Sequence, residues 1–487
     1  MPSPPLAGGR PRRTLAIGAP LVACALVVLV LVRRETGGDG FAAGLGLAAL
    51  PVPFLLGVFA WLDGVTRKPW RTLAFSFAWG AGAATLLSLL CNGLLVGALT
   101  GREAQLAPLG ADALDTLELT VIAPVVEESA KAVAVALLFL CARPWFDGVL
   151  AGVTAAGVTA TGFAFTENVL YLGSAVAYDV SYERLGLDGG ATLAAFFVRV
   201  VLAPFAHPMF TAVTGVAIGL AASWRPRGRA GRWGRALLPP LGLAGAMGLH
   251  SAWNASTALS LWGFAAVYAL LMLPVFASLA WLAAWSRQRE LRVVRRVLPA
   301  YARAGWLAPD EPRALGSPRG RALARRLARQ QHGLAGLRAA VGYQAAAGSV
   351  AVLRWRASHG HVPDFAARER ELLARLWRHR ALAGPATAEA ARWGAGPGGG
   401  PAARPAGRAR AAASAQRDAE PFVAAGVGEQ PLPLLGAELA GEVEADQVDA
   451  GADVEEVEQP GDREAGGGVG GPAGLADERG VADRPAQ

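Results

Sequence analysis

The feature that most constrains this chain is a series of apolar runs, each about 20 residues long or longer, before residue 286. A helical run of this length spans the hydrocarbon core of a bilayer. Only 17% of the residues are charged, whereas about 25% is usual for a soluble domain. We therefore expect an all-α fold, a polytopic membrane helix bundle of about eight transmembrane helices. The expected spans are 14–32, 41–62, 72–99, 113–141, 148–173, 193–222, 236–256 and 260–285.

The charges of the connecting loops predict how these spans are oriented. Arg and Lys are enriched in cytoplasmic loops, and they gather on one side if the N-terminal lead, residues 1–13, is inside. Arg33 and Arg34 are the exception. The first run is too long for a usual signal peptide, so we expect a membrane anchor. We predict two cytoplasmic termini and, from the Ala-, Gly- and Arg-rich composition, a bacterial plasma membrane protein.

The chemistry of the chain changes after the last span. Residues 286–383 are basic with helical apolar spacing, which predicts a helical cytoplasmic region. Residues 384–487 are first low in complexity and, from 418 onward, carry 17 acidic and 3 basic residues, which is typical of a disordered tail. The net charge of +8 does not indicate nucleic-acid binding. Basic loops that face anionic lipids at the cytoplasmic surface already explain it.

Four consecutive spans carry polar side chains that membrane helices usually avoid. A charge at the bilayer centre costs roughly 2.5–3.5 kcal/mol on insertion scales, so such residues usually serve a function and face the protein interior. At about 1.5 Å per helical residue, Glu127, His207 and His250 fall near mid-membrane, and Glu167 falls nearer the outer side. The polar residues are Glu127, Glu128 and Lys131; Glu167 and Asn168; His207; and His250 and Asn254.

Spacing within the helices groups these side chains. Lys131 lies one turn after Glu127 and Glu128 and can partly neutralise both. His250 and Asn254 are four residues apart and share a helix face. Histidines and glutamates at a common depth can bind a divalent metal such as zinc. Equally, two neighbouring carboxylates hold protons unequally, and one of them can then activate water without a metal. The spacing leaves both mechanisms open.

Each polar residue also has a structural interpretation. A buried Glu–Lys cluster can serve ion pairing alone, a membrane Asn can bond one helix to another, and a lone membrane His is more often structural. Gly215 and Gly219 form a GxxxG pattern that predicts close helix packing. The co-occurrence of polar residues at similar depth on four spans nevertheless favours a functional site.

Four motifs on these spans, in their order along the chain, resemble the PrsW family of intramembrane proteases. The resemblance covers roughly residues 40–290. The family is classed as metallopeptidase-like and is distantly similar to the CAAX prenyl endopeptidases, for whose relatives a metal-free glutamate mechanism is proposed. The motifs are Glu127-Glu-Ser-Ala-Lys131, Phe163-Ala-Phe-Thr-Glu-Asn-Val-Leu-Tyr171, Ala206-His-Pro-Met-Phe-Thr-Ala212 and His250-Ser-Ala-Trp-Asn254.

The resemblance implies an intramembrane endopeptidase that cleaves a membrane-anchored protein, such as an anti-sigma factor in stress signalling. Either glutamate of the pair would activate water, the histidines would bind the oxyanion, donate a proton or hold a metal, and Lys131 would tune the pair. The implied catalytic residues are Glu127, Glu128, Glu167, Asn168, His207, His250 and Asn254. The implied metal ligands are Glu128, Glu167, His207 and His250.

Two other functions fit the same polar residues. Buried Glu, His and Lys also line ion and proton pathways, so a transporter is one alternative. A non-catalytic membrane scaffold that keeps these residues for folding is the other.

Overall fold

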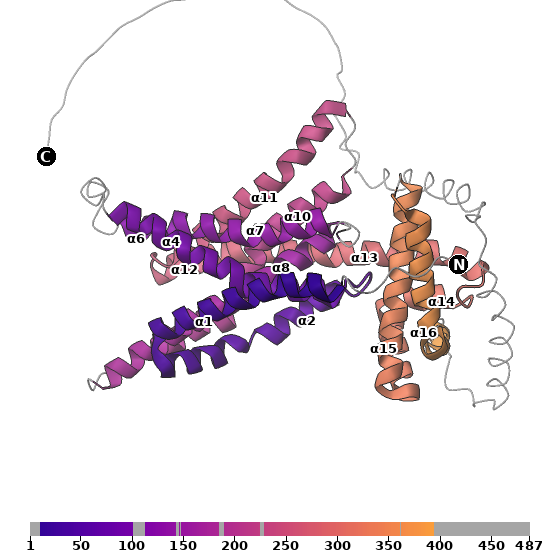
Figure 1. Ribbon diagram of the computed structural model, residues 1–487, viewed down its shortest axis with the longest axis horizontal. Helices are drawn as coiled ribbons and strands as arrows, with labels where there is room; N and C mark the ends of the chain where they lie inside the picture. Colours follow the sequence, from indigo (N-terminus) through magenta and orange to yellow (C-terminus); the bar gives the residue numbers. More distant parts are fainter. Residues whose placement is uncertain are drawn as a thin grey trace, which may run out of the picture. The chain divides into compact units, whose positions relative to one another are not determined.

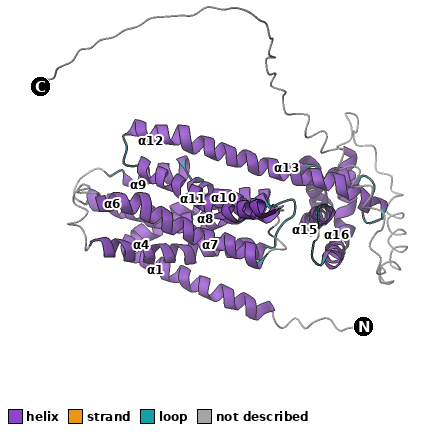
Figure 2. Ribbon diagram, turned by 90° about the horizontal axis from the view of Figure 1, so that it is seen from above, coloured by secondary structure: helices purple, strands orange, loops and turns teal. Residues whose placement is uncertain are grey.

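The computed structural model describes residues 10–100, 113–142, 146, 148–184, 189–224, 228–360 and 362–393. Within these ranges all regular secondary structure is helical, which confirms the all-α fold (Figures 1 and 2). The predicted low-complexity and acidic tail, residues 384–487, lies outside the described residues from 394 onward, as do residues 1–9 of the N-terminal lead. Residues 384–393 were wrongly assigned to this tail: they complete a helix that ends at Trp393, because Ala386 and Ala390 pack into buried apolar clusters.

The first described element is a kinked helix. Helix α1 (Arg10–Ala49) bends at Gly37, whose φ of 71° suits a residue without a Cβ. Val28 and Val32, before the bend, share a buried cluster with Ala48, after it. The chain therefore doubles back at Gly37, and α2 (Val52–Leu62) continues the returning arm.

One helix forms the centre of the bundle. The apolar window of α8 (Val149–Glu183) is 89% buried, against 33% or less in every other stretch long and apolar enough to span a membrane. Small residues let its neighbours approach closely. A Cβ on Gly152 would lie 1.9 Å from the carbonyl oxygen of Gly215 on α10 (Ala206–Ser223), and one on Gly219 would lie 2.6 Å from the α8 backbone. The predicted close packing at the GxxxG pattern is confirmed.

Five helical stretches in the described part of the chain are long and apolar enough to cross a membrane, which makes this a multi-pass membrane protein. The first joins the two predicted spans 14–32 and 41–62. Helix α7 (Ala123–Cys141) is not among the five because it carries three charged residues. Helix α11 (Gly228–Ser256) is less apolar because of its prolines, glycines and arginines. The number eight therefore stays a prediction. The five stretches are Gly18–Leu62, Trp70–Thr100, Val149–Glu183, Ala191–Ser223 and Leu261–Arg303.

In the described residues, four π-helical turns interrupt the membrane helices, a feature frequent near functional sites. Trp79, in the first of them, donates its indole N–H to the carbonyl oxygen of Ala130 on α7 at 3.0 Å. Tyr268, in the last, donates its hydroxyl to the carbonyl oxygen of Leu202 at 2.9 Å. These turns are η2 (Trp79–Ala84), η4 (Glu118–Ile122), η6 (Phe197–Leu202) and η7 (Tyr268–Met272). The flanking helices are α3 (Trp70–Ala78), α4 (Thr85–Thr100), α6 (Ala113–Leu117), α9 (Ala191–Phe196) and α12 (Leu261–Val267).

The predicted span 193–222 is broken, contrary to the expectation of one continuous helix. The helix stops at residues 203–205, between η6 and α10. Pro204 explains the break, because a residue that precedes proline disfavours the helical region, and Ala203 has φ −132° and ψ 45°. His207 follows as the second residue of α10.

The C-terminal described residues form a second helical core. Helix α13 (Leu273–Arg303) runs through residue 285 without a break, and α14 (Glu311–Leu315), α15 (Pro318–Ser358) and α16 (Phe365–Trp393) follow. The four helices and the loop before α3 contribute to one buried apolar cluster. Its largest members include Tyr301, Tyr343, Leu291, Leu298, Leu315 and Leu376, and Val65 comes from the loop.

Candidate active site

Helix α7 holds three charged side chains inside the bundle. Glu128 and Lys131 are 0% exposed and Glu127 is 8% exposed. The Lys131 ammonium donates to Glu128 Oε1 at 2.8 Å and to Glu127 Oε2 at 3.2 Å, as the sequence spacing predicts. It also lies 3.9 Å from the centre of the Phe163 ring, a cation–π contact. Each charge thus has a partner, without which burial would be costly.

The first turn of α10 brings His207 to these charges. Its Nδ1 lies 3.2 Å from Lys131 Nζ, so the ring nitrogen accepts from the ammonium. Its Nε2 lies 2.6 Å from Glu167 Oε2 on α8, a contact that lacks the alignment of a full hydrogen bond. Acceptance at Nδ1 places the ring proton of a neutral His207 on Nε2, facing Glu167. Glu167 and Lys131 therefore fix the orientation of this imidazole.

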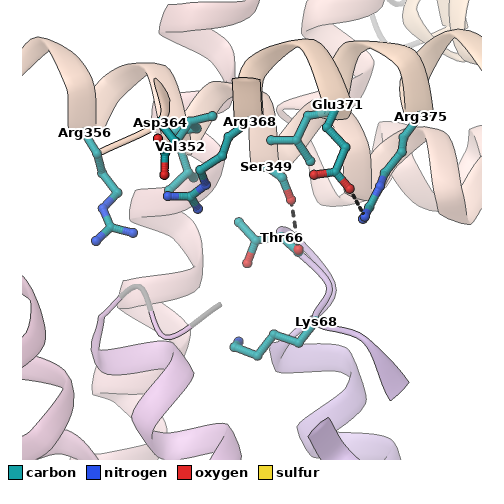
Figure 3. Close-up of a pocket in the computed structure, with 11 residues that line it drawn as sticks. Thr66, Lys68, Ser349, Val352, Arg356, Asp364, Arg368, Glu371 and Arg375 are labelled. Atoms are coloured by element: carbon teal, nitrogen blue, oxygen red, sulfur yellow. Dashed lines mark hydrogen bonds and ion pairs between the residues drawn. The ribbon is translucent and has the colours of Figure 1, made fainter. Parts of the chain in front are cut away.

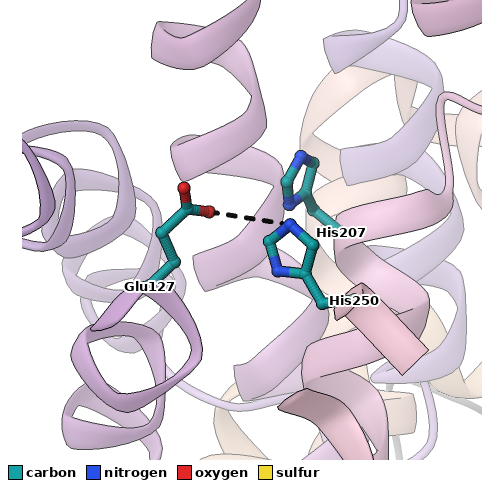
Figure 4. Close-up of side chains that lie close together, drawn as sticks. All are labelled: Glu127, His207 and His250. Atoms are coloured by element: carbon teal, nitrogen blue, oxygen red, sulfur yellow. Dashed lines mark ion pairs between the residues drawn. The ribbon is translucent and has the colours of Figure 1, made fainter. Parts of the chain in front are cut away.

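Helix α11 supplies the second histidine. His250 is 2% exposed, and its Nδ1 lies 3.2 Å from Glu128 Oε1. Its Nε2 lies 3.9 Å from Glu127 Oε2, and Figure 4 shows Glu127 facing the two imidazole rings. The His250 ring stacks on Phe210 with 5.0 Å between ring centres, and it stands nearly perpendicular to His207 at 5.1 Å. Four helices thus meet at one glutamate–histidine cluster, made of Glu127, Glu128, Glu167, His207 and His250.

The cluster contains a group that fits a metal ion. Among the described residues, Glu127, His207 and His250 offer ligand atoms that all lie within 4.8 Å of one another. Two His and one Glu are the protein ligands of several catalytic zinc sites. Tetrahedral ligand atoms at about 2.1 Å from the ion lie about 3.4 Å apart, so the three side chains would have to move closer together to bind it.

Electrostatics also favour a cation here. The cluster and its immediate contacts hold three carboxylates, of Glu127, Glu128 and Glu167, against the cations of Lys131 and Arg199. With both imidazoles neutral, three negative and two positive charges leave an excess of one negative charge. A buried site of negative net charge attracts a cation or a proton.

This ligand group differs from the predicted set of Glu128, Glu167, His207 and His250. Glu128 is engaged at both oxygens, because Oε1 contacts Lys131 and His250 and Oε2 accepts from Thr211 at 2.8 Å. Glu167 contacts His207 instead of sharing the space between the rings. Glu127 takes the place that the sequence assigned to Glu128.

The two predicted asparagines bond partners outside the glutamate–histidine cluster. Asn168 accepts from Arg199 Nη1 at 3.1 Å. Asn254 donates to the carbonyl oxygen of Leu119, in η4, at 2.9 Å. Their assignment as ligands of the substrate carbonyl stays a prediction.

Two residues that lie next to the cluster, Arg199 and Thr211, were not predicted from the sequence. Arg199 lies 3.5 Å from Glu167 and packs over the Tyr171 ring at 3.5 Å. As a charge inside the predicted span 193–222, it could have been found by the argument that singled out Glu127. Thr211, the partner of Glu128, gave no such signal, because membrane threonines commonly bond their own helix backbone.

The sequence of residues 68–279 matches the model of the PrsW family intramembrane metalloproteases. The matched stretch includes every residue of the glutamate–histidine cluster, and the helical region after residue 286 lies beyond it. A search of curated proteins gave no match, and neither did a search of solved structures.

Proposed function

We propose that this chain, whose residues 68–279 belong to the PrsW family of intramembrane metalloproteases, hydrolyses peptide bonds of a membrane-anchored protein. The observation that carries the proposal is the buried cluster of three carboxylates, two imidazoles and one ammonium, gathered from four helices. Peptide hydrolysis needs an activated water, a stabilised oxyanion and a proton donor. The cluster contains groups able to serve each need.

The positions of the carboxylates suggest a division of roles. A divalent metal such as zinc would be held by Glu127, His207 and His250, where it would acidify a water molecule and polarise the scissile carbonyl. Glu128 contacts His250 and Glu167 contacts His207, so each imidazole is oriented by a carboxylate, as is usual for metal-binding histidines.

Glu127 is the carboxylate that we assign to proton transfer. It contacts Lys131 and His250 through Oε2, whereas Glu128 is engaged at both oxygens. Its side chain is 11% exposed and that of Glu128 is 0% exposed, so Glu127 is the more accessible to water and substrate. Glu127 Oε1 would take the proton of the attacking water and then give it to the leaving amine, so that the C–N bond breaks with no net change in protons. Lys131 supplies a fixed positive charge beside the developing oxyanion.

In this proposal the two asparagines act indirectly, by positioning residues of the cluster. Asn168 holds Arg199, which in turn contacts Glu167 and through it His207. Asn254 joins α11 to η4 and so keeps His250 next to α7.

The family and the apolar helices support a substrate that is itself anchored in the membrane. A single-span regulator of the anti-sigma factor type, cut first by this enzyme in a stress response, is the substrate that we propose. The enzyme would lie in a bacterial plasma membrane with both termini in the cytoplasm, where its basic loops contact anionic lipids.

A matched pair of variants tests the catalytic assignment. Glu127→Gln keeps the size of the side chain but can neither accept a proton nor offer a carboxylate to a metal, so cleavage of a co-expressed single-span anti-sigma factor should fall at least about 100-fold. Glu183→Gln makes the same change at the exposed end of α8 and should leave cleavage unchanged. A Glu127→Gln protein that cleaves at the wild-type rate would show that the assignment is wrong.

The metal is tested separately on purified protein. We expect about one divalent ion per chain and loss of cleavage after chelation, restored by zinc. Cleavage that survives complete metal removal would leave the peptidase assignment standing and would point to Glu127 acting without a metal.

A further inference from the structure

The C-terminal helices hold a loop of the membrane bundle. Residues 63–69 connect α2 to α3, and Val65 of this loop is fully buried in the C-terminal core. Arg321 on α15 donates to the carbonyl oxygen of Gly64 at 2.6 Å, and Ser349 donates to that of Thr66 at 3.0 Å. This loop is therefore fixed by side chains far away in the sequence.

A basic pocket of about 360 Å³ lies beside this loop, between it and helices α15 and α16 (Figure 3). Its volume falls within the usual range for small-molecule sites, about 300–1,000 Å³. Four basic and two acidic side chains line it, an excess of two positive charges. Lys68 also pairs with Asp63 at 2.6 Å. The lining charges are Lys68, Arg356, Arg368 and Arg375, with Asp364 and Glu371.

The residue types in the pocket suit a phosphate group. Guanidinium groups bind phosphate oxygens with several parallel N–H donors, and lysine adds a point charge. A phosphate group is anionic at pH 7, with about 1.5 to 2 negative charges as a monoester, and is attracted to a pocket lined mostly by cations. Lys68 is held by Asp63 and Arg375 by Glu371, so two of the four cations are already fixed in place. The hydroxyl residues Thr66 and Ser349 also line the pocket.

Two exposed indoles place this pocket at the level of lipid headgroups. Trp61 is 52% exposed and Trp70 is 73% exposed, one on each side of the loop. Tryptophan is enriched where a membrane meets water. The phosphate can therefore come from a phospholipid headgroup or from a soluble phosphate compound.

We propose that this pocket binds a phosphate group, which bridges the 63–69 loop to α15 and α16 and fastens the C-terminal helices to the membrane bundle. The loop continues from α2, whose Phe59 packs against Gly157 of α8. Helix α8 also carries Glu167, so the pocket is linked through packed helices to the glutamate–histidine cluster.

Binding to the full-length protein in maltoside detergent, which carries no phosphate, tests the proposal and identifies the source. One arm adds phosphatidylglycerol to the micelles, and measures amide hydrogen exchange of residues 63–69 and lipid retained in native mass spectrometry. The other arm titrates inorganic pyrophosphate into the lipid-free micelles by calorimetry. Binding in the first arm alone indicates a lipid headgroup, and binding in the second indicates a soluble phosphate; either supports the proposal.

The variants distinguish the loss of cations that line the pocket from the loss of positive charge elsewhere on the surface. Arg356→Gln with Arg368→Gln removes two lining cations and should weaken binding of the effective probe at least about tenfold. Arg370→Gln removes one arginine charge, as Arg356→Gln alone does, from an exposed position of α16 that does not line the pocket, and it should bind within about twofold of wild type. If the double variant does not fold, Arg356→Gln alone is compared. No binding of either probe, or equal losses in the Arg370 and pocket variants, would overturn the proposal.

Discussion

At the scale of single residues, Lys131 sets the charge balance of the glutamate–histidine cluster. Its ammonium contacts Glu127 and His207, two of the three residues that would hold a metal. Ammonium and metal therefore compete for the same lone pairs. In Lys131→Gln we expect zinc to bind at least about tenfold more tightly, because one positive charge within a few ångströms is gone. Without metal the unfolding free energy should fall by about 3–5 kcal/mol, because two buried carboxylates lose their partner.

Lys68 is a natural control for this prediction. It is the other lysine of the chain, it is also buried, and it pairs with Asp63 outside the cluster. Lys68→Gln should lower stability but leave zinc affinity unchanged. Chelator competition measures the affinity, and unfolding in mixed detergent measures the stability. Equal or weaker zinc binding in Lys131→Gln would contradict the competition argument.

Thr211 carries a second prediction at this scale. Thr211→Val keeps the shape of the side chain but removes the hydroxyl that donates to Glu128 Oε2. A buried carboxylate oxygen then loses a donor, so the unfolding free energy should fall by about 1–3 kcal/mol. Thr159→Val is the matched control, since within the described part of the chain the Thr159 hydroxyl donates to a carbonyl of its own helix, on Ala155. If the unfolding free energy falls equally in both variants, the hydrogen bond to Glu128 contributes no more to stability than a bond within one helix.

The sequence predicted most of the cluster because charges and imidazoles stand out in apolar spans. It could not tell Glu127 from Glu128, because adjacent residues point in different directions from a helix and their partners come from other helices. Thr211 and His250 decide that difference. Asn254 shares a face with His250 as predicted, yet it bonds Leu119, a contact with a part of the chain 135 residues away.

At the scale of helices, the close contact between α8 and α10 positions Glu167 against His207. A Cβ on Gly152 would lie 1.9 Å from the Gly215 carbonyl oxygen, so Gly152→Ala must push the two helices apart. We expect the unfolding free energy to fall by about 1–3 kcal/mol and cleavage to fall with it. Gly93→Ala, on α4, adds the same methyl group where no atom lies within 4 Å and should not lower stability. A Gly152→Ala protein as stable as Gly93→Ala would refute this account of the packing.

Helices were easier to predict than their interruptions. Apolar length alone predicted a span at 193–222, which the structure places at Ala191–Ser223, but it did not predict the break at residues 203–205. Pro204 was a visible signal for it, because proline disfavours a helical residue before it. Pro208 was not a breaker, because it occupies the first turn of α10, where no N–H partner is lost.

At the scale of the whole molecule, the C-terminal helices are joined to the membrane bundle by contacts that no local pattern predicts. Arg321 reaches the carbonyl oxygens of Gly64, Leu315 and Gln344. Burial lowers the pKa of Arg321 to about 9, so the guanidinium remains charged at neutral pH and its donors remain available. A basic helical region could be read from composition, but its attachment to the 63–69 loop depends on residues more than 250 positions apart.

The buried carboxyl of Glu311 gives the C-terminal helices a pH dependence that can be measured. Glu311 accepts hydrogen bonds from the Tyr343 hydroxyl at 2.7 Å and the Ala308 N–H at 3.0 Å, yet burial raises its pKa above the usual range. The folded state therefore holds a proton that the unfolded state has released. This contribution to stability is complete below the unfolded pKa and is lost as pH rises through the folded pKa, by at most about 1.4 kcal/mol per pH unit.

Glu311→Gln, which mimics the protonated carboxyl, should remove this pH dependence. Amide hydrogen exchange of α14–α16 in the full-length protein, followed upward from pH 4.5, should show opening that becomes easier with pH in the wild type and stays level in the variant. Glu389→Gln makes the same change on α16, where Glu389 accepts from Gln331 at the surface, and should keep the wild-type slope. A Glu311→Gln protein with the wild-type slope would mean that another group, not this carboxyl, takes up the proton on folding.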